Sequence, residues 1–72
     1  MTDLGKKVKE LRNKQELSQY KLSYEADIDR SQVIGIEKGE INATISTIAA
    51  LADALKVKPK DLLDFWIFIK EG

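Results

Sequence analysis

Apolar residues recur along this chain with the period of an α-helix rather than the alternation of a β-strand. Leu4, Val8 and Leu11 follow one another in steps of four and three residues, which puts them on one helix face. A second set with helical spacing, expected to face the core from a later helix, consists of Ile45, Ile48, Ala52 and Leu55. No segment alternates apolar and polar residues for the length of a strand, so the pattern predicts an all-α chain.

Two short predicted helices meet at a tight corner near the middle of the chain. Ser18 is a good N-cap for a helix that runs over about 19–25, because its hydroxyl can accept a hydrogen bond from the first turn. Asp27 can take the left-handed conformation that ends a helix, although less comfortably than glycine. Asp29 is a strong N-cap for a further helix over about 30–38.

The remaining boundaries follow from glycine, threonine and proline. Gly39 is expected to end the third helix, whose Val33 and Ile36 face the core, and Thr44 can cap a fourth helix. Pro59 suits the first position of a last helix, predicted over 59–69. Since no linker or repeat interrupts this series, we expect residues 1–72 to form a single domain of five helices.

The composition closes most routes to enzyme chemistry. The 72 residues include no cysteine and no histidine, which excludes disulfides, thiolate or imidazole metal ligands and the commonest general base. The sequence also contains no nucleophile–base pair and no phosphate-binding glycine loop. We therefore predict that the protein is not an enzyme and has no catalytic residues, cofactor or metal site.

Signals for export or membrane insertion are absent from the sequence as well. The N-terminal segment is too polar for a signal peptide, and the longest apolar run, over 65–69, is far shorter than the ~20 residues of a membrane span. We therefore expect a cytoplasmic protein that makes no membrane contact.

Charge is balanced overall but uneven along the chain. Twelve basic and twelve acidic residues cancel, which argues against indiscriminate binding to nucleic acid. Residues 1–14 nevertheless carry five basic side chains against Asp3 and Glu10. These basic residues are Lys6, Lys7, Lys9, Arg12 and Lys14. This local excess of positive charge, although small, has the sign that binding to DNA requires.

The two helices joined by a corner form a helix-turn-helix pattern, and particular residues in it point to one family. The matching segments are Leu11-Arg12, Leu17-Ser18-Gln19, Leu22, Ile28-Asp29-Arg30-Ser31, Val33, Ile36-Glu37-Lys38-Gly39, Asn42 and 48–57. With these segments in order and without a gap, residues 4–63 resemble the phage repressor and Cro-type family, also called the xenobiotic-response-element family. The resemblance implies a compact five-helix, lambda-repressor-like bundle whose third helix enters the DNA major groove.

By this resemblance, Arg30 and Ser31 occupy first-turn positions that face base edges, and Gln32 follows them. An arginine there can bind guanine O6 and N7 in bidentate fashion. Two alternatives for Arg30 are a phosphate contact and a pair with Asp29 or Asp27. For Gln32, both a base and a phosphate remain open as partners.

Other matched positions imply contacts that carry no sequence information. Ser18 and Gln19 at the start of the second helix, with Lys38 and Asn42 at the far end of the third, correspond to residues that hold the DNA backbone. The resemblance also implies that Gln19 braces the third helix. The alternative for Gln19 is an ordinary solvated residue at a helix start.

The resemblance also implies one structural ion pair. Arg12 on the first helix corresponds to a basic residue that pairs with Glu37 behind the third helix. Such a pair sets the angle between helices rather than touching bases, and removing one partner leaves a charge unmatched.

Three residues depart from the family pattern. Asp27 stands where the family usually has glycine, so we expect a slightly strained corner. Gly35 replaces a long polar residue at a position expected to face the groove, and Ile34 is apolar where the family is polar. Ile34 can meet either a thymine methyl or a neighbouring protein surface. Base readout is therefore expected to rest on 30–32.

The C-terminal segment 65–69 is apolar around its whole circumference, which is typical of an interface. The residues expected at the interface of a symmetric homodimer are Phe65, Trp66, Phe68 and Ile69. Trp66 and one of the phenylalanines are its expected anchors. Two reading helices would then enter successive major grooves, roughly 34 Å apart, on a palindromic operator of double-stranded DNA. The alternative is that this segment packs onto the first helix of its own chain.

Taken together, these features predict a small transcriptional regulator, a repressor or autoregulator of the kind found with prophages, restriction systems and toxin–antitoxin pairs. The alternative is a protein-interaction module, in particular an antitoxin whose apolar C-terminal helix binds a toxin or another partner protein.

Overall fold

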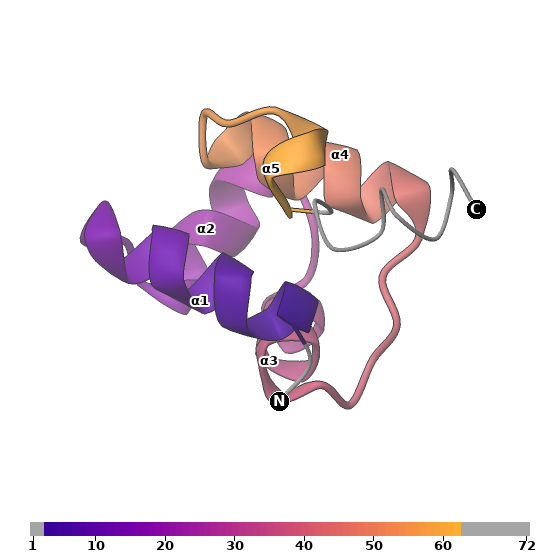
Figure 1. The fold of residues 1–72 in the computed structure, drawn as a ribbon. Coiled ribbons are helices and arrows are strands. Elements are labelled where there is room, and N and C mark those ends of the chain that lie inside the picture. Colours follow the sequence, from indigo (N-terminus) through magenta and orange to yellow (C-terminus); the bar gives the residue numbers. More distant parts are fainter. Residues whose placement is uncertain (1–2, 63–72) are drawn as a thin grey trace.

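The computed structural model describes the backbone of residues 3–62 and the side chains of residues 4–62. Its helices, labelled in Figure 1, are α1 (Asp3–Lys14), α2 (Gln19–Ala26), α3 (Arg30–Lys38), α4 (Ile45–Ala54) and α5 (Pro59–Leu62). No strand occurs in this part of the chain, and the predicted all-α bundle is confirmed. The predicted continuation of the last helix to residue 69, with Phe65, Trp66, Phe68 and Ile69, lies outside the described residues.

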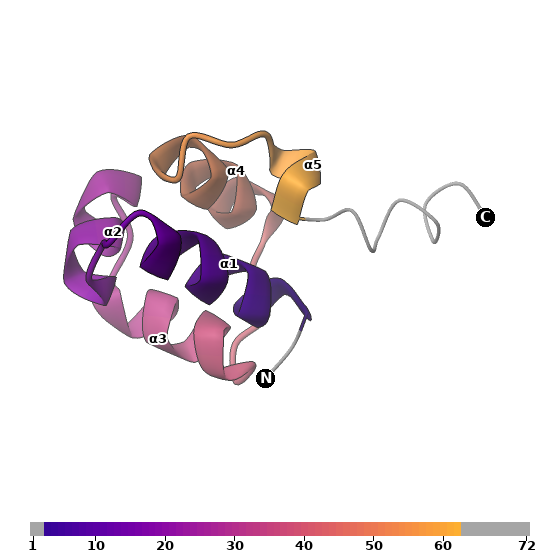
Figure 2. The same cartoon turned by 60° about the vertical axis from the view of Figure 1, so that its left-hand side comes forward.

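The helices form a bundle in which α3 stands at one end and α4 with α5 at the other. Figures 1 and 2 both show α1 and α2 between these ends. In agreement, α3 packs on α1 and α2, while α4 contacts α2 and α5. Consequently, α3 turns one side toward the bundle and leaves the opposite side at the molecular surface.

The hydrophobic core receives at least one side chain from every helix. Its fully buried large members are Val8, Leu22, Val33, Ile36, Ile48, Leu51, Leu55 and Leu62. Leu4 and Leu11, the other members of the N-terminal stripe, are half-buried against this cluster. The helical spacing therefore predicted the core-facing side of α1, α3 and most of α4 correctly.

One member of the predicted core is wrong. Ile45 is 71% exposed although Ile48, three residues later, is buried. Ile45 is the first residue of α4, directly after the N-cap Thr44. The apolar stripe therefore starts one turn before the part of α4 that the other helices cover.

Most of the predicted helix ends are confirmed by hydrogen bonds and backbone angles. Ser18 Oγ accepts a hydrogen bond from the Lys21 amide at 2.9 Å, and Thr44 Oγ1 accepts one from the Thr47 amide at 3.1 Å. Gly39 follows α3 in the left-handed conformation, at φ 79° and ψ 20°. These contacts are local, which is why the chain pattern was sufficient to locate them.

Asp29 differs from the prediction in its chemistry. It occupies the N-cap position of α3 in extended conformation, but its side chain makes no capping hydrogen bond. Its backbone carbonyl accepts hydrogen bonds from the amides of Gln32 and Val33. The boundary is correct, whereas the expected carboxylate cap is wrong.

Candidate nucleic-acid interface

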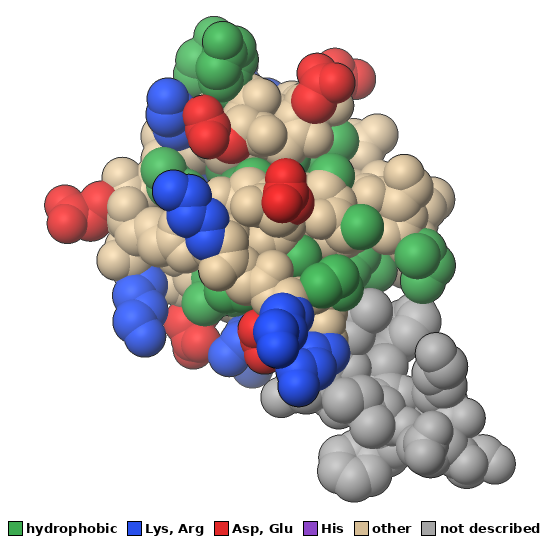
Figure 3. All heavy atoms as spheres, turned by 90° about the horizontal axis from the view of Figure 1, so that it is seen from above, with side chains coloured by type: hydrophobic (Ala, Val, Ile, Leu, Met, Phe, Trp, Pro, Cys, Tyr) green, Lys and Arg blue, Asp and Glu red, His purple; other side chains and the backbone are tan. Residues whose placement is uncertain are grey.

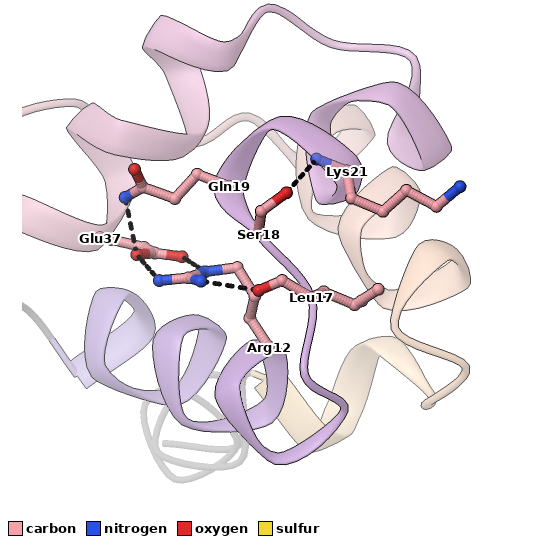
Figure 4. A network of polar contacts seen from close by, with 6 residues as sticks. All are labelled: Arg12, Leu17, Ser18, Gln19, Lys21 and Glu37. Carbon is pink, nitrogen blue, oxygen red and sulfur yellow. Dashed lines mark hydrogen bonds and ion pairs between the residues drawn. The ribbon is translucent and has the colours of Figure 1, made fainter.

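A buried ion pair joins α1 to the inner side of α3. Arg12 Nε donates to Glu37 Oε2 at 2.7 Å, and Arg12 Nη2 donates to Glu37 Oε1 at 3.0 Å (Figure 4). Arg12 is 9% exposed and Glu37 is 3% exposed. The planar guanidinium therefore contacts the carboxylate in a bidentate, desolvated ion pair. This is the geometry in which arginine–carboxylate pairs are strongest.

Two further groups complete this network. Arg12 Nη1 donates to the Leu17 carbonyl at 2.8 Å, and Gln19 Nε2 donates to Glu37 Oε1 at 3.1 Å. Figure 4 shows the four residues converging from α1, the loop after it, α2 and α3. No buried side-chain nitrogen or oxygen among the described residues lacks a hydrogen-bond partner. The network thus connects α3 to α1 and α2 through fully hydrogen-bonded polar groups, which fix the position of the helix.

The backbones of α1 and α3 also approach closely beside this network. A Cβ placed on Gly5 would lie 2.8 Å from the carbonyl oxygen of Glu37 and would also meet the carbonyl of Ile36. Because only glycine leaves room for this approach, Gly5 sets the spacing at the C-terminal end of α3.

The corner between α2 and α3 is formed by backbone hydrogen bonds around Asp27. This residue lies in the left-handed region at φ 57° and ψ 46°, as the sequence predicted. Its amide donates to the Tyr24 carbonyl at 3.2 Å, and the Ile28 amide donates to the Ser23 carbonyl at 3.0 Å. A non-glycine residue in this conformation stores a small amount of strain.

The outer side of α3 has a different character. Ser31 and Lys38 are exposed there, opposite the buried residues Val33 and Ile36, and Arg30 is exposed in the first turn of the helix. No ion pair between described residues joins Arg30 to Asp27 or Asp29. The guanidinium of Arg30 is therefore available to a partner outside the protein.

Gln32 lies at the side of α3 rather than on its outer face. It is half-buried and lines an open hollow between α2 and α3, together with Tyr20, Tyr24 and Asp29. The structure therefore separates Gln32 from Ser31, although the sequence grouped the two in one reading turn.

The four residues expected at the DNA backbone lie at the two ends of the helix-turn-helix. The hydroxyl of Ser18 caps α2, and the Gln19 side chain is half-buried because its amide reaches Glu37. Lys38 and Asn42 are both exposed at the far end of α3. Gln19 is thus more than a solvated helix-start residue, since it braces α3.

One sequence interpretation of the outer face is wrong. The sequence predicts that Gly35 faces the groove, but this residue is buried because the side chain of Ile41 covers it. Sequence reasoning did not single out Ile41 at all. A signal was present, since a glycine inside a helix often marks a close approach by another segment.

The face formed by α4 and α5 carries charges of both signs. Figure 3 shows the face over α4 and α5, where basic and acidic side chains are interspersed. Residues 4–62 contain no group of three or more acidic, histidine or cysteine side chains placed to hold a metal ion. No helix among the described residues is long and apolar enough to cross a membrane.

Known proteins share both the sequence and the architecture of this region. Residues 8–62 match a family model described as helix-turn-helix. The chain is 44% identical over 62 residues to control protein C.BamHI of Bacillus amyloliquefaciens, covering 85% of this chain and 76% of that protein. An immunity repressor protein of Bacillus phage phi105 is 31% identical over 68 residues, a match that covers 94% of this chain and 47% of the repressor.

A solved structure extends the similarity to three dimensions. The restriction-modification controller protein C.AhdI from Aeromonas hydrophila matches with a TM-score of 0.82 and 38% sequence identity. The match covers 83% of this chain and 91% of C.AhdI.

Proposed function

Because this chain belongs to the helix-turn-helix family, we propose that it is a DNA-binding regulator of transcription that places α3 in the major groove of its operator. The family expected from the sequence motifs is confirmed. The observation that carries the proposal is the asymmetry of α3, whose inner side is locked by the Arg12–Glu37 pair while Arg30, Ser31 and Lys38 stand exposed outside. A rigidly held helix with free polar groups is what direct readout requires.

Base discrimination is assigned to the exposed first turn of α3. Arg30 supplies a guanidinium fork that can bind guanine O6 and N7, and Ser31 supplies a hydroxyl that can donate or accept. Gln32, at the side of the helix, is assigned to the edge of the contact, where it can reach a base or a phosphate. The absence of a competing ion pair at Arg30 within residues 4–62 supports this assignment.

Affinity independent of sequence is assigned to Ser18, Gln19, Lys38 and Asn42. The first pair stands at the N-terminus of α2, where the helix dipole and free amides favour a phosphate. Lys38 adds a positive charge in the last turn of α3, and each neutralised phosphate releases counterions. Because the chain has no net charge, this local placement matters more than the total.

The operator is proposed to be palindromic and to bind a homodimer. So few base-reading groups on one chain cannot select a single site in a genome, so a second copy is needed. The residues assigned to the dimer contact, Phe65, Trp66, Phe68 and Ile69, lie outside the described residues. Sedimentation at micromolar concentration tests this point, because a species of 8.1 kDa would contradict the dimer.

The regulatory direction is proposed to be repression or autoregulation in the cytoplasm, without enzymatic activity. Among the relatives, one is named an immunity repressor and another a control protein. No relative named above is described as an antitoxin, so the toxin-binding alternative is not favoured.

Selection from a random pool of double-stranded DNA tests the proposed function. We expect an enriched sequence with two related half-sites, bound with an affinity that falls steeply as salt rises, by about 0.9 in log–log slope for each phosphate contacted. A pool with no enriched sequence after repeated rounds would contradict sequence-specific binding.

A further inference from the structure

Gly35 has an unexpected environment on the outer side of α3. Ser31, Gly35 and Lys38 follow one another in steps of four and three residues and therefore share one face of the helix. Ser31 and Lys38 are exposed, yet Gly35 between them is buried. A segment from elsewhere in the chain must therefore cover the outer face at this point.

The covering group is the side chain of Ile41. A Cβ placed on Gly35 would lie 2.6 Å from Ile41 Cγ1 and 3.2 Å from Ile41 Cβ, and would overlap Ile41 Cδ1. Ile41 thus occupies the volume that a side chain at position 35 would otherwise fill. It nevertheless remains 41% exposed, so it presents an apolar surface between Ser31 and Lys38.

The backbone holds Ile41 in this place. Gly39, in left-handed conformation, turns the chain back over the end of α3. The carbonyl of Gly35 then accepts hydrogen bonds from the amides of Glu40 at 2.8 Å and Ile41 at 3.2 Å. Since isoleucine is branched at Cβ and has few rotamers, its side chain is ordered before any ligand arrives.

An apolar side chain exposed on a face that reads DNA matches one group of the major groove. In the major groove, the C5-methyl of thymine is the apolar group by which an unmodified base pair can be distinguished. Burying that methyl against a preordered isoleucine removes apolar surface from water without loss of side-chain freedom.

We propose that Ile41 is a specificity-determining residue that contacts the C5-methyl of a thymine, and that Gly35 is a positioning residue that makes room for it. The inference rests on the proposed function and refines it, because it adds an apolar contact beyond the first turn of α3. It also gives Gly35 a role within the interface instead of a missing contact.

The test replaces each thymine of the selected DNA, one at a time, by deoxyuridine, which removes only the methyl group. For the wild-type protein we expect one thymine in each half-site whose replacement weakens binding about fourfold, the effect of one buried methyl. Ile41→Ala should bind the thymine and deoxyuridine forms of that site equally. Binding is measured by titration of labelled duplex at constant salt.

A second variant and a matched control make the outcome decisive. Gly35→Ala adds a methyl group that displaces Ile41 while favouring the helix, so it should also lose the thymine preference. Ile45→Ala removes an exposed isoleucine at the start of α4 and should keep the preference. Thermal melting followed by circular dichroism verifies that each variant is folded.

Two results would overturn the inference. One is a wild-type protein that binds its selected DNA without any thymine-methyl dependence, and the other is a dependence that persists unchanged in Ile41→Ala. Both leave sequence-specific binding intact. Failure of the proposed function is distinguishable, since in that case no DNA sequence is enriched from the pool in the first place.

Discussion

The polar groups of α3 have opposite environments on its two sides. On the inner side, Glu37 accepts three hydrogen bonds from Arg12 and Gln19 and is almost completely buried. Away from this network, Arg30 in the first turn and Lys38 in the last turn are exposed, with no ion pair among the described residues. The hydrogen-bonded polar groups on the inner side hold the helix in place, whereas the exposed polar groups remain available to DNA.

This division separates stability from recognition within nine residues of helix. A change on the inner side should alter the free energy of unfolding and leave base preference intact, and a change on the outer side should do the reverse.

Removing the inner carboxylate should have the strongest consequence. We expect Glu37→Ala to lower the free energy of unfolding by about 3–5 kcal/mol, because Arg12 is left as an unmatched buried charge and Gln19 loses its acceptor. Urea denaturation measures the change. Glu40→Ala, which removes an exposed carboxylate beside α3, is the matched control and should change stability by less than about 0.5 kcal/mol. Equal stability of the two variants would contradict the structural role of the pair.

Removing the outer guanidinium should change recognition without changing stability. We expect Arg30→Ala to lose about 1–3 kcal/mol of discrimination at one base pair of the half-site, the usual worth of a bidentate arginine contact. Competition binding with single-base variants of the operator measures this loss. Its melting temperature should equal that of the wild type, because the side chain is exposed and unpaired among residues 4–62. A uniform loss across all DNA sequences would instead assign Arg30 to a phosphate.

Removing the lysine at the far end of α3 should weaken every DNA sequence alike. We expect Lys38→Ala to reduce the slope of log K against log salt by about one for each half-site, since one phosphate contact is lost. Titrations at several salt concentrations measure the slope. Lys9→Ala, an exposed lysine on α1, serves as a control with the same change of charge. A relaxed base preference in Lys38→Ala would contradict the assignment to the backbone.

The smallest effect is expected at the corner that joins α2 to α3. Asp27→Gly should raise the free energy of unfolding by about 0.5–1 kcal/mol, because glycine adopts the left-handed conformation without a Cβ penalty. Asp27→Ala keeps the Cβ and should not stabilise the protein. Thermal melting compares both variants with the wild type, and their base preferences should be unchanged. Lower stability of the glycine variant would indicate that Asp27 makes a favourable contribution that outweighs its strain.

Several expectations about the interface came from the family resemblance and not from spacing alone. Arg12 and Glu37 are 25 residues apart, and no local periodicity connects them. Their meeting depends on α1 and α3 lying side by side, as Figure 2 shows. The assignments of Arg30, Ser31 and Gln32 to base reading stay predictions, although the structure separates Gln32 from the outer face.

The sequence by itself determined the elements of this protein and their boundaries. Ser18, Thr44 and Gly39 act within a few residues of themselves through capping hydrogen bonds and backbone preference, and the spacing of Val33 and Ile36 specifies which side of α3 is buried. These are short-range effects, so the order of residues along the chain contains the information needed to predict them.

Only the tertiary structure decided how segments that are distant in sequence, or that a chain reversal brings together, pack against one another. Ile45 is exposed because the other helices do not cover the first turn of α4. The Gln19 amide turns inward because the Glu37 carboxylate comes within 3.1 Å. Ile41 covers Gly35 because the left-handed Gly39 folds the chain back. Each outcome depends on packing between segments, and the volume available at a residue is a property of its neighbours in space, which helical periodicity does not encode.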